Sequence, residues 1–424
     1  MNNKKSVKNS AKLVAAVLVM LNASVAFAAP VELSLSDSVA LALKNNPSIK
    51  MAQSDREKSK WGVDEAQAGR LPTVSLGSSY SLKDNSPAGT DDLSNSLRMN
   101  WQLYSGGRVE GQIDQAKRGV SVADLGVEKT KQQLKLDTTS AYFTILQTKN
   151  LVDVNRQSVS NLQEHLTSVQ AKYDVGVVAK SDVLRAEVEL ANAQQNLIKA
   201  QNNYDLAVAG LLNTMTIDPG TELALTDTLG YQKYDKTLDD SLTAAQVRPD
   251  VAQADENVKI AETAIKMAKS GKRPSVSVSA SNGWSGSVLP ESGDDDWNVG
   301  LSASWSLFDA GSTNAKVKQA DASLDKVKEQ AVQVKNAAAL EVRQNYLSMQ
   351  EAEKRIDTNK VAVGKAEEDL VIAREKYNAG VGTNLDVIDA QLALTQAKTN
   401  EIQALYDYNV SVAKIDKAIG LKAE

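Results

Sequence analysis

The stretch KYDVGVVAKSDVLRAEVELANA, residues 172–193, returns 204 residues later as KYNAGVGTNLDVIDAQLALTQA, residues 376–397. Nine of the 22 positions are identical between the two stretches. In each of them a helical pattern stops at a glycine, and a second helical pattern starts a few residues further on. Glycine reaches the positive φ that a tight turn between helices needs. The sequence therefore predicts the same helical hairpin twice.

Other landmarks of the sequence recur at nearly the same interval. The interval is 202 or 204 residues for each of these pairs: Asn46-Pro47 with Arg248-Pro249, Pro72 with Pro274, Trp101 with Trp305, and Tyr142 with Tyr346. A fixed, long interval that covers the whole chain indicates a duplicated unit rather than a solenoid of many short repeats. We expect an internal two-fold repeat, with residues 29–235 as the first unit and residues 236–424 as the second.

Each unit contains one very long helical pattern. Apolar or small residues follow steps of three, four or seven from Ile113 to Tyr173, and the pattern returns from Val317 to Tyr377 with one stutter. Such a heptad pattern is typical of a coiled-coil helix, here roughly 90 Å long at 1.5 Å per residue. We expect long helices over residues 106–173 and 310–377.

Shorter helices are expected on either side of the long ones. Helices over residues 181–213 and 385–419 should return from the two glycine turns. Helices over about 36–70 and 240–272 should precede the strands, and residues 214–239 should form a linker halfway along the molecule. Ser36 is a candidate N-cap, and Pro47 predicts a kink in the helix that Ser36 would begin.

Before each long helix the hydrophobic period drops to two. Four segments alternate apolar and small polar residues, over residues 72–83, 94–104, 274–286 and 297–308. This pattern is typical of membrane-spanning β-barrel strands around a wet lumen. Aromatic residues stand near the ends of these segments, as expected at membrane interfaces: Tyr80, Trp101, Tyr104, Trp284, Trp297, Trp305 and Phe308.

Four strands are too few to close a barrel, because eight is the usual minimum for a single chain. An open sheet edge is not tolerated in lipid. Three chains would supply twelve strands. We therefore expect an α+β membrane protein: a homotrimeric 12-stranded β-barrel, with four strands per chain in two pairs, continued by a long α-helical coiled-coil barrel.

Charge and composition exclude several classes of function. Residues 1–28 carry four lysines, an apolar run and Ala26-Phe27-Ala28, which together predict a signal peptide. The chain has no cysteine, a net charge of −5 and no basic patch, so we expect neither thiol chemistry nor a nucleic-acid partner. The single histidine, His165, is interpreted as a helix-surface residue. Because no catalytic or ligand spacing is present, we expect no enzyme activity, no cofactor and no metal.

Taken together, the sequence resembles the TolC-family outer membrane channels over nearly the whole chain that follows the signal peptide. The resemblance rests on the two KYxxG…DV hairpins, the NNP and RPD segments, and the two strand pairs that each follow a proline. It implies a trimer held in outer membrane lipid, with a helical tunnel in the periplasm. It also implies an exit duct for a tripartite efflux pump or a type I secretion system, with a periplasmic adaptor protein and an inner-membrane pump as partners.

The resemblance assigns roles to residues at the two hairpins. Asp386 and Asp389 match carboxylates of a periplasmic constriction that would select cations. Alternatively, they are only polar partners of a helix N-terminus. The remaining matches are Ser181, Asp182 and Tyr377 to gate contacts, and Gly176, Val177, Gly380 and Val381 to turns that meet the adaptor. Gly382 stands where the family has an arginine, so one closing contact is expected to be absent.

Two other classes of protein are weighed against a channel. A trimeric autotransporter adhesin also combines a coiled coil with four strands per chain, but its strands would be contiguous at the C-terminus. Here they form two internal pairs, and the chain ends in a helical pattern. A purely structural periplasmic coiled coil would not need the alternating strands.

Overall fold

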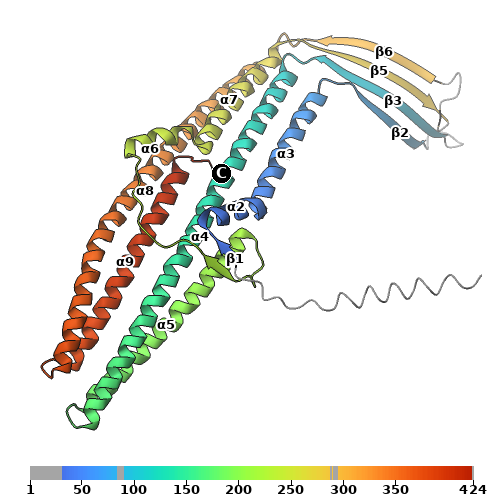
Figure 1. Cartoon of the computed structure of the whole chain (residues 1–424). Helices are drawn as coiled ribbons and strands as arrows, with labels where there is room; N and C mark the ends of the chain where they lie inside the picture. The colour runs from blue at the N-terminus through green and yellow to red at the C-terminus, as the bar shows by residue number, and fades with distance from the viewer. Residues whose placement is uncertain (1–30, 84–89, 287–288, 290–294, 423–424) are drawn as a thin grey trace, which may run out of the picture.

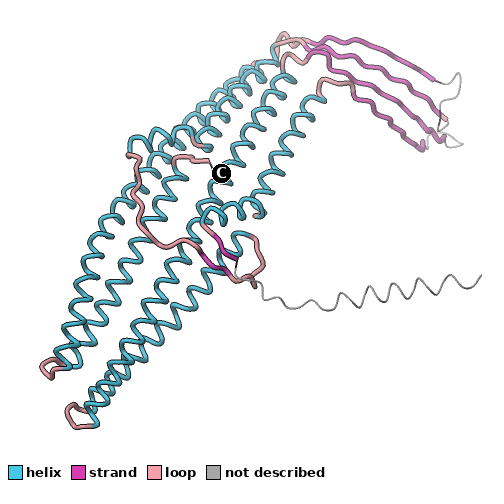
Figure 2. The backbone as a smooth tube through the Cα atoms, in the orientation of Figure 1, coloured by secondary structure: helices cyan, strands magenta, loops and turns pink. Residues whose placement is uncertain are grey.

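The computed structural model describes residues 31–83, 90–286, 289 and 295–422. The expected signal peptide and most of the two loops between paired strands lie outside these residues. In Figures 1 and 2 a four-stranded sheet lies at one end of a long bundle of helices, and two hairpin turns lie at the other end.

Two helices of 67 residues each span the bundle, which corresponds to about 100 Å at 1.5 Å per residue. Shorter helices accompany them on either side of the middle of the molecule (Figure 1). The helices are α4 (Arg108–Asp174) and α8 (Ser312–Asn378), with α5 (Lys180–Met215) and α9 (Asn384–Ala418) toward the turns, and α3 (Pro47–Ala68) and α7 (Pro249–Lys269) toward the sheet.

The lateral order of the helices is simple. Toward the turns, α5 packs on α4, α4 on α9 and α9 on α8. Toward the sheet, α3 packs on α4, α4 on α7 and α7 on α8. One flank of the chain is therefore formed by α3 and α5, and the opposite flank by α8 along its whole length.

The sheet continues the same order. Its strands are β2 (Thr73–Lys83), β3 (Thr90–Tyr104), β5 (Ser275–Ser285) and β6 (Asp295–Ser304), and each pairs antiparallel with the next. The central β3–β5 pairing joins the two halves of the sequence. Among the described strands, β2 and β6 pair on one side only, so the sheet has two open edges.

The strand register sorts the side chains onto two faces. Leu76 lies opposite Leu97, Trp101 opposite Val278, and Val278 opposite Leu301, which makes one apolar face across all four strands. The other face is built mainly from serine and other small polar residues. The hydroxyls of Ser277 and Ser302 lie 3.0 Å apart on it.

The start of the upper helices differs from the expectation. Ser34, not Ser36, is the N-cap of α2 (Leu35–Asn45), because its hydroxyl accepts a hydrogen bond from the Asp37 amide. Pro47 does not kink a continuous helix. It begins a new helix, α3, whose N-cap is Asn46.

The second unit shows similar differences. The expected helix over residues 240–272 is divided into α6 (Leu238–Ala244), a 3-10 turn over Ala245–Val247, and α7, since Pro249 takes the first position of a new helix. Strand β6 ends at Ser304, four residues earlier than expected. Trp305 and Phe308 therefore lie in the connection that follows the strand.

A small belt of structure surrounds the helices at mid-height. β1 (Val31–Leu33) pairs in parallel with β4 (Leu223–Leu225), a pairing that the sequence did not predict. Residues 226–237, here called the equatorial strap, then cross from β4 toward α6 (Figure 1). The strap is tied to the buried Tyr408 of α9, whose hydroxyl donates to the Gln232 carbonyl at 2.8 Å and accepts from the Tyr234 amide at 3.0 Å.

Candidate functional site: the two hairpin tips

The two hairpin turns share one backbone design. Gly176 and Gly380 take positive φ angles of 80° and 78°. The Val177 amide donates to the Lys172 carbonyl at 2.9 Å, and the Val381 amide donates to the Lys376 carbonyl at 3.0 Å. This is the glycine-dependent helix ending in which the apolar residue after glycine commonly packs back onto the helix. Here both valines are instead exposed at the end of the molecule.

Gly382 occupies a crowded part of the second turn. A Cβ atom added there would lie 2.9 Å from the Lys376 Cβ and 3.0 Å from the Tyr377 amide nitrogen. The neighbouring backbone cannot move aside without changing the turn. The turn as it stands therefore leaves no room for a side chain at residue 382.

The two carboxylates of α9 have different surroundings. Asp386 closes a capping box: its carboxylate accepts from the Thr383 amide at 2.8 Å, and its own amide donates to the Thr383 hydroxyl at 3.2 Å. These hydrogen bonds with Thr383 lower the pKa of Asp386. Asp389 is exposed, and the part of the chain that the structure describes gives it no ion pair.

A polar cluster joins the two hairpins just above the turns. The imidazole Nε2 of His165 lies 2.6 Å from the Asn384 side-chain oxygen, and the Asn384 amide donates to the Asp182 carbonyl at 3.0 Å. The Lys172 ammonium donates to the Tyr377 carbonyl and lies 3.8 Å from the centroid of the Tyr377 ring. These five residues, here called the inter-hairpin cluster, connect α4, α5, α8 and α9.

His165 is buried within this cluster and is not the surface residue that the sequence suggested. Its ring also contacts the Tyr377 ring edge-on, with centroids 5.1 Å apart. Burial lowers the pKa of His165, and the positive charges of Arg374 and Lys172 lower it further. Because the Asn384 oxygen can only accept, we assign the ring proton to Nε2 of a neutral imidazole.

The other residues matched to the gate are placed as follows. The Tyr377 ring is buried, but its hydroxyl finds no hydrogen-bond partner in the described residues. Burial, together with the nearby charge of Asp182, raises the pKa of that hydroxyl. Ser181 is exposed on the first turn of α5. Tyr377 thus meets the first hairpin through its ring and its carbonyl, not through its hydroxyl.

The aromatic residues of the sheet lie at two levels. Tyr80, Trp284 and Trp297 lie toward the loops, whereas Trp101, Tyr104, Trp305 and Phe308 lie toward the helices. The register separates the levels of Tyr80 and Trp101 by eight residues, or roughly 27 Å along a strand.

Two of these tryptophans anchor the sheet to the helices. The Trp101 indole donates to the Arg70 carbonyl at 2.8 Å, and the Trp305 indole donates to the Lys272 carbonyl at 3.0 Å. Both acceptors lie at the junction between a helix and the strand that follows it. In the part of the chain that the structure describes, no helix has an apolar stretch long enough to cross a bilayer.

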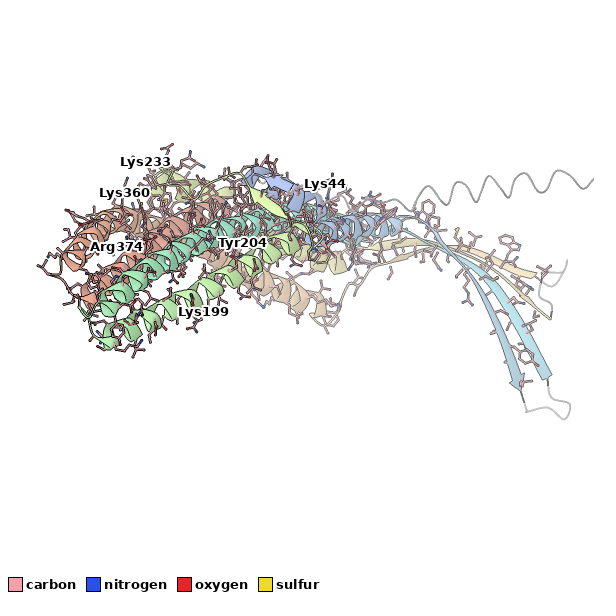
Figure 3. The ribbon with its side chains drawn as sticks, turned by 60° about the horizontal axis from the view of Figure 1, so that its bottom comes forward. Lys44, Lys199, Tyr204, Lys233, Lys360 and Arg374 are labelled. Atoms are coloured by element: carbon pink, nitrogen blue, oxygen red, sulfur yellow. The ribbon has the colours of Figure 1, made fainter. Side chains whose placement is uncertain are left out.

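Residues at equivalent positions of α5 and α9, 204 positions apart, differ in how far other helices cover them. On α9, Ile388, Ile402 and Val410 are exposed by 2%, 9% and 7%. Each lies three or four positions from Gln391 or Tyr406, which hydrogen-bond to α4, and therefore on the face of α9 that meets α4. The residues 204 positions earlier on α5 are Leu184, Ile198 and Leu206, which are exposed by 50%, 71% and 63%. Figure 3 shows α5 on the outside of the bundle, with Lys199 directed away from it. Within one chain, α5 therefore carries a packing face without a helix to cover it.

Sequence comparison finds relatives over most of the chain. It is 26% identical over 396 residues to "Outer membrane protein TolC" of Escherichia coli (strain K12), which covers 89% of this chain and 80% of that protein. It is 24% identical over 397 residues to "Solvent efflux pump outer membrane protein SrpC" of Pseudomonas putida, with 89% and 83% covered. It is 23% identical over 408 residues to "Alkaline protease secretion protein AprF" of Pseudomonas aeruginosa, with 90% and 83% covered.

Structure comparison finds the same architecture. A solved structure of CusC superposes with a TM-score of 0.80 at 19% identity, covering 92% of this chain and 93% of that one. The open state of the Neisseria gonorrhoeae MtrE outer membrane channel superposes with a TM-score of 0.79 at 19% identity, covering 92% and 90%. The fold is thus that of the TolC-like outer membrane channels.

The family model described as "Outer membrane efflux protein" matches residues 39–215 and 242–421. These ranges contain both hairpins and all four strands of the sheet. An adhesin or a purely structural rod, the alternatives raised by the sequence, does not account for this match. Members of the family are efflux channels, not enzymes. The chain belongs to the outer membrane efflux protein family, and it serves in the outer membrane as an exit duct for efflux or type I secretion.

Proposed function

We propose that three copies of this chain close into a ring and form one duct, a 12-stranded β-barrel continued by a helical tunnel. The observation that carries this proposal is the alignment of open edges. One flank of the chain ends in β2, α3 and α5, and the other ends in β6 and α8. Because the two flanks differ, contact between copies is head-to-tail, which makes rings when the rotation closes.

The bare face of α5 supports the same arrangement. Its apolar residues repeat the positions by which α9 packs on α4, and α8 of a second copy is the element equivalent to α4. A ring would cover these residues and would also pair β2 of one copy with β6 of the next. The apolar surface and the unpaired strand edges would then be satisfied together.

The number three follows from the resemblance to TolC-family channels, and the internal repeat is consistent with it. The two units have long helices of equal length, and their turns share two backbone hydrogen bonds, from the glycine amide to a tyrosine carbonyl and from the valine amide to a lysine carbonyl. We infer that the chain arose by duplication and that six similar hairpins surround the axis of the trimer.

The sheet is proposed to cross the outer membrane with its apolar face toward lipid and its serine-rich face toward the lumen. The two aromatic levels are separated along the strands by roughly the height of the apolar band of an outer membrane barrel, about 25 Å. Tyr80, Trp284 and Trp297 would then lie at the outer interface, and Trp101, Tyr104, Trp305 and Phe308 at the periplasmic one.

The hairpin tips are proposed to form the gate and the partner surface. The exposed Val177 and Val381, each beside a turn glycine, offer small apolar contacts for a periplasmic adaptor, which would connect the duct to an inner-membrane pump. The inter-hairpin cluster, with Ser181 beside it, would hold neighbouring hairpins together. Asp386 and Asp389 would line the constriction in three copies each, and clustered carboxylates attract cations.

Single-channel conductance tests this proposal. The purified protein should run as a trimer that heat dissociates, and it should give a cation-preferring conductance in a planar bilayer. The double variant Asp386→Asn/Asp389→Asn should form the same trimer with a weaker preference for cations. A monomeric protein would contradict the ring, whereas unchanged selectivity would remove only the role of the two aspartates.

A further inference from the structure

The contacts between the two hairpins of one chain predict which residues meet between neighbouring chains. The helices toward the turns lie in the order α5, α4, α9, α8, so the second hairpin repeats the first by a shift along one layer. In the proposed ring, α8 of one copy meets α5 of the next as α4 meets α9 within a copy. Adding 204 to the number of each α4 residue gives the expected contact residue of α8. Subtracting 204 from the number of each α9 residue gives its expected partner on α5 of the next copy.

Among the described residues, five hydrogen-bonded side-chain pairs join α4 to α9, and none of them joins two charged residues. They are Thr144 with Tyr406, Gln147 with Gln403, Ser158 with Thr395, Asn161 with Gln391, and His165 with Asn384. They are spaced along the helix from mid-height to the turns. They therefore define the register of the whole contact.

The shift converts these five pairs into a different set of residues. Two of the resulting pairs are uncharged, Ser348 with Asn202 and Ala362 with Ala191. The other three each join a positive to a negative residue: Glu351 with Lys199, Lys365 with Glu187, and Asp369 with Lys180. No pair joins like charges, and all six charged side chains belong to exposed residues of the single chain.

We propose that α5 of one copy docks on α8 of a second copy through these three ion pairs, which we call the seam pairs. The inference rests on the proposed ring. It adds the register in which α5 meets α8 and the pairing of opposite charges between them. The seam pairs flank the bare apolar face of α5, so apolar contact and charge complementarity favour the same register. Wrong registers would bring like charges together or bury unpaired ones, which makes the ion pairs a device for specificity.

The neighbours of the seam pairs within one chain leave them available. Lys365 contacts Glu368 at 2.9 Å and Glu351 contacts Arg355 at 2.6 Å, both within exposed turns of α8. Exposed pairs of this kind contribute little energy. Lys180, Glu187, Lys199 and Asp369 make no ion pair in the described residues.

Site-directed cross-linking tests the register directly, because the natural chain has no cysteine. The double variant Lys199→Cys/Glu351→Cys, treated with a short bis-maleimide in the intact outer membrane, should give covalent dimers and trimers on denaturing gels. The matched control Gln147→Cys/Gln403→Cys carries the equivalent pair within one chain, and its cross-linked product should run as a monomer. Single-cysteine variants should give no linked product.

Charge reversal tests the energetics of the same seam. Glu187→Lys and Lys365→Glu should each lower the temperature at which the trimer dissociates, and their combination should restore it. A trimer whose cysteine pairs at the seam do not cross-link would overturn the seam pairs and leave the duct intact. If the double reversal did not restore the dissociation temperature, the pairing of Glu187 with Lys365 would be wrong. Absence of any trimer in the parent protein would overturn the proposed ring as well.

Discussion

At the tip of the first hairpin, α5 begins behind Ala179, which provides no side-chain cap, whereas α9 begins behind Thr383, which closes a capping box with Asp386. The preceding turns are nearly superimposable in their hydrogen bonds and in their glycine angles. Within the turns, residues 174–179 and 378–383, only the glycine and the valine after it are identical, so the shared backbone design depends on few side chains.

Equivalent residues on the outer faces of the two hairpins also differ in burial and in charge. Ile402 of α9 is buried against α4, whereas Ile198 of α5 has no cover within the chain. The five side-chain pairs that join α4 to α9 include no pair of charged residues, whereas three of the five equivalent pairs between α8 and α5 would join opposite charges. A contact within one chain forms at high effective concentration, but a contact between chains must also select its partner.

The largest effect is expected when a charge is placed at each of the two equivalent isoleucines. Ile198→Asp should abolish the trimer and leave a folded, helical monomer, because the residue is exposed until chains assemble. Ile402→Asp should destabilise the chain itself, since it buries an unpaired charge. Circular dichroism and native mass measurement distinguish the two outcomes.

Asn192 provides the control for this experiment. It is exposed on α5, and its equivalent Gln396 is also exposed on α9. Asn192→Asp should therefore leave the trimer intact. If Ile198→Asp assembled as well as Asn192→Asp, the bare face of α5 would have no part in the ring.

A second difference concerns charge at the constriction. Arg185 of α5 is the equivalent of Asp389, and each lies one residue before a buried alanine, Ala186 or Ala390. The shift that relates the hairpins places both residues on the same side of the helical layer. In a ring, three arginines would therefore accompany three aspartates at one level of the lumen.

Ion selectivity of the channel tests whether Arg185 and Asp389 both face the lumen. Arg185→Gln should increase the preference for cations, and Asp389→Asn should decrease it, because each removes a charge of opposite sign from the same level. The ratio of cation to anion permeability, measured from reversal potentials in a salt gradient, gives the result. Equal ratios in the parent and in Arg185→Gln would place the arginine outside the lumen.

Acid should weaken the contact between the hairpins through His165. Two positive residues face it, Lys172 of α4 and Arg374 of α8, of which Arg374 is labelled in Figure 3. The neighbouring α9 offers the neutral amide of Asn384, and α5 offers Asp182. Burial keeps the pKa of folded His165 below its ordinary value of 6.5. The contribution of the neutral imidazole is therefore complete above that pH and is lost as the pH falls below it.

Hydrogen exchange at the start of α9 measures this effect. Exchange corrected for its intrinsic pH dependence should be faster at pH 5.5 than at pH 7.5 in the parent. His165→Gln retains an N–H donor for Asn384 but cannot gain a proton, so its exchange should differ little between the two conditions. A parent as insensitive to pH as this variant would exclude His165 as the titrating group.

The smallest expected effect comes from exchanging the helix caps. Thr383→Ala should cost about 1 kcal/mol of local stability at the start of α9, the usual loss for such a cap. Ala179→Thr should stabilise the start of α5 by a similar or smaller amount, because Asp182 already occupies the position of Asp386. Hydrogen exchange in the first turns of both helices should then change in opposite directions.

Periodicity gave the elements of the fold their approximate limits. The heptad pattern placed the first long helix at residues 106–173, and α4 spans Arg108–Asp174. Alternation placed a strand at residues 274–286, and β5 spans Ser275–Ser285. Both segments are long, and apolar or small residues return to the same face of the helix or strand along its length, so its period is visible in the sequence.

Features that depend on single residues or short segments could not be predicted in this way. The pairing of β1 with β4 involves three residues from each strand, too few for a visible period. A lone histidine in a heptad run, with no second histidine to pair with, predicts a surface residue, yet His165 is buried. The helix α4 packs on α5 and on α9, so a residue beside one seam can lie on the other. In a layer of helices, two seams must be traced on each helix.

The unbroken length of α4 has a mechanical consequence. Tyr142, held at the belt by hydrogen bonds to Asp227 and the Leu33 carbonyl, lies 32 residues from Asp174 at the turn, or about 48 Å. A tilt of five degrees about the belt would displace the tip by roughly 4 Å, more than the diameter of a water molecule. The belt thus offers a pivot near the middle of α4, and a partner bound at the tip would act on an arm of about 48 Å.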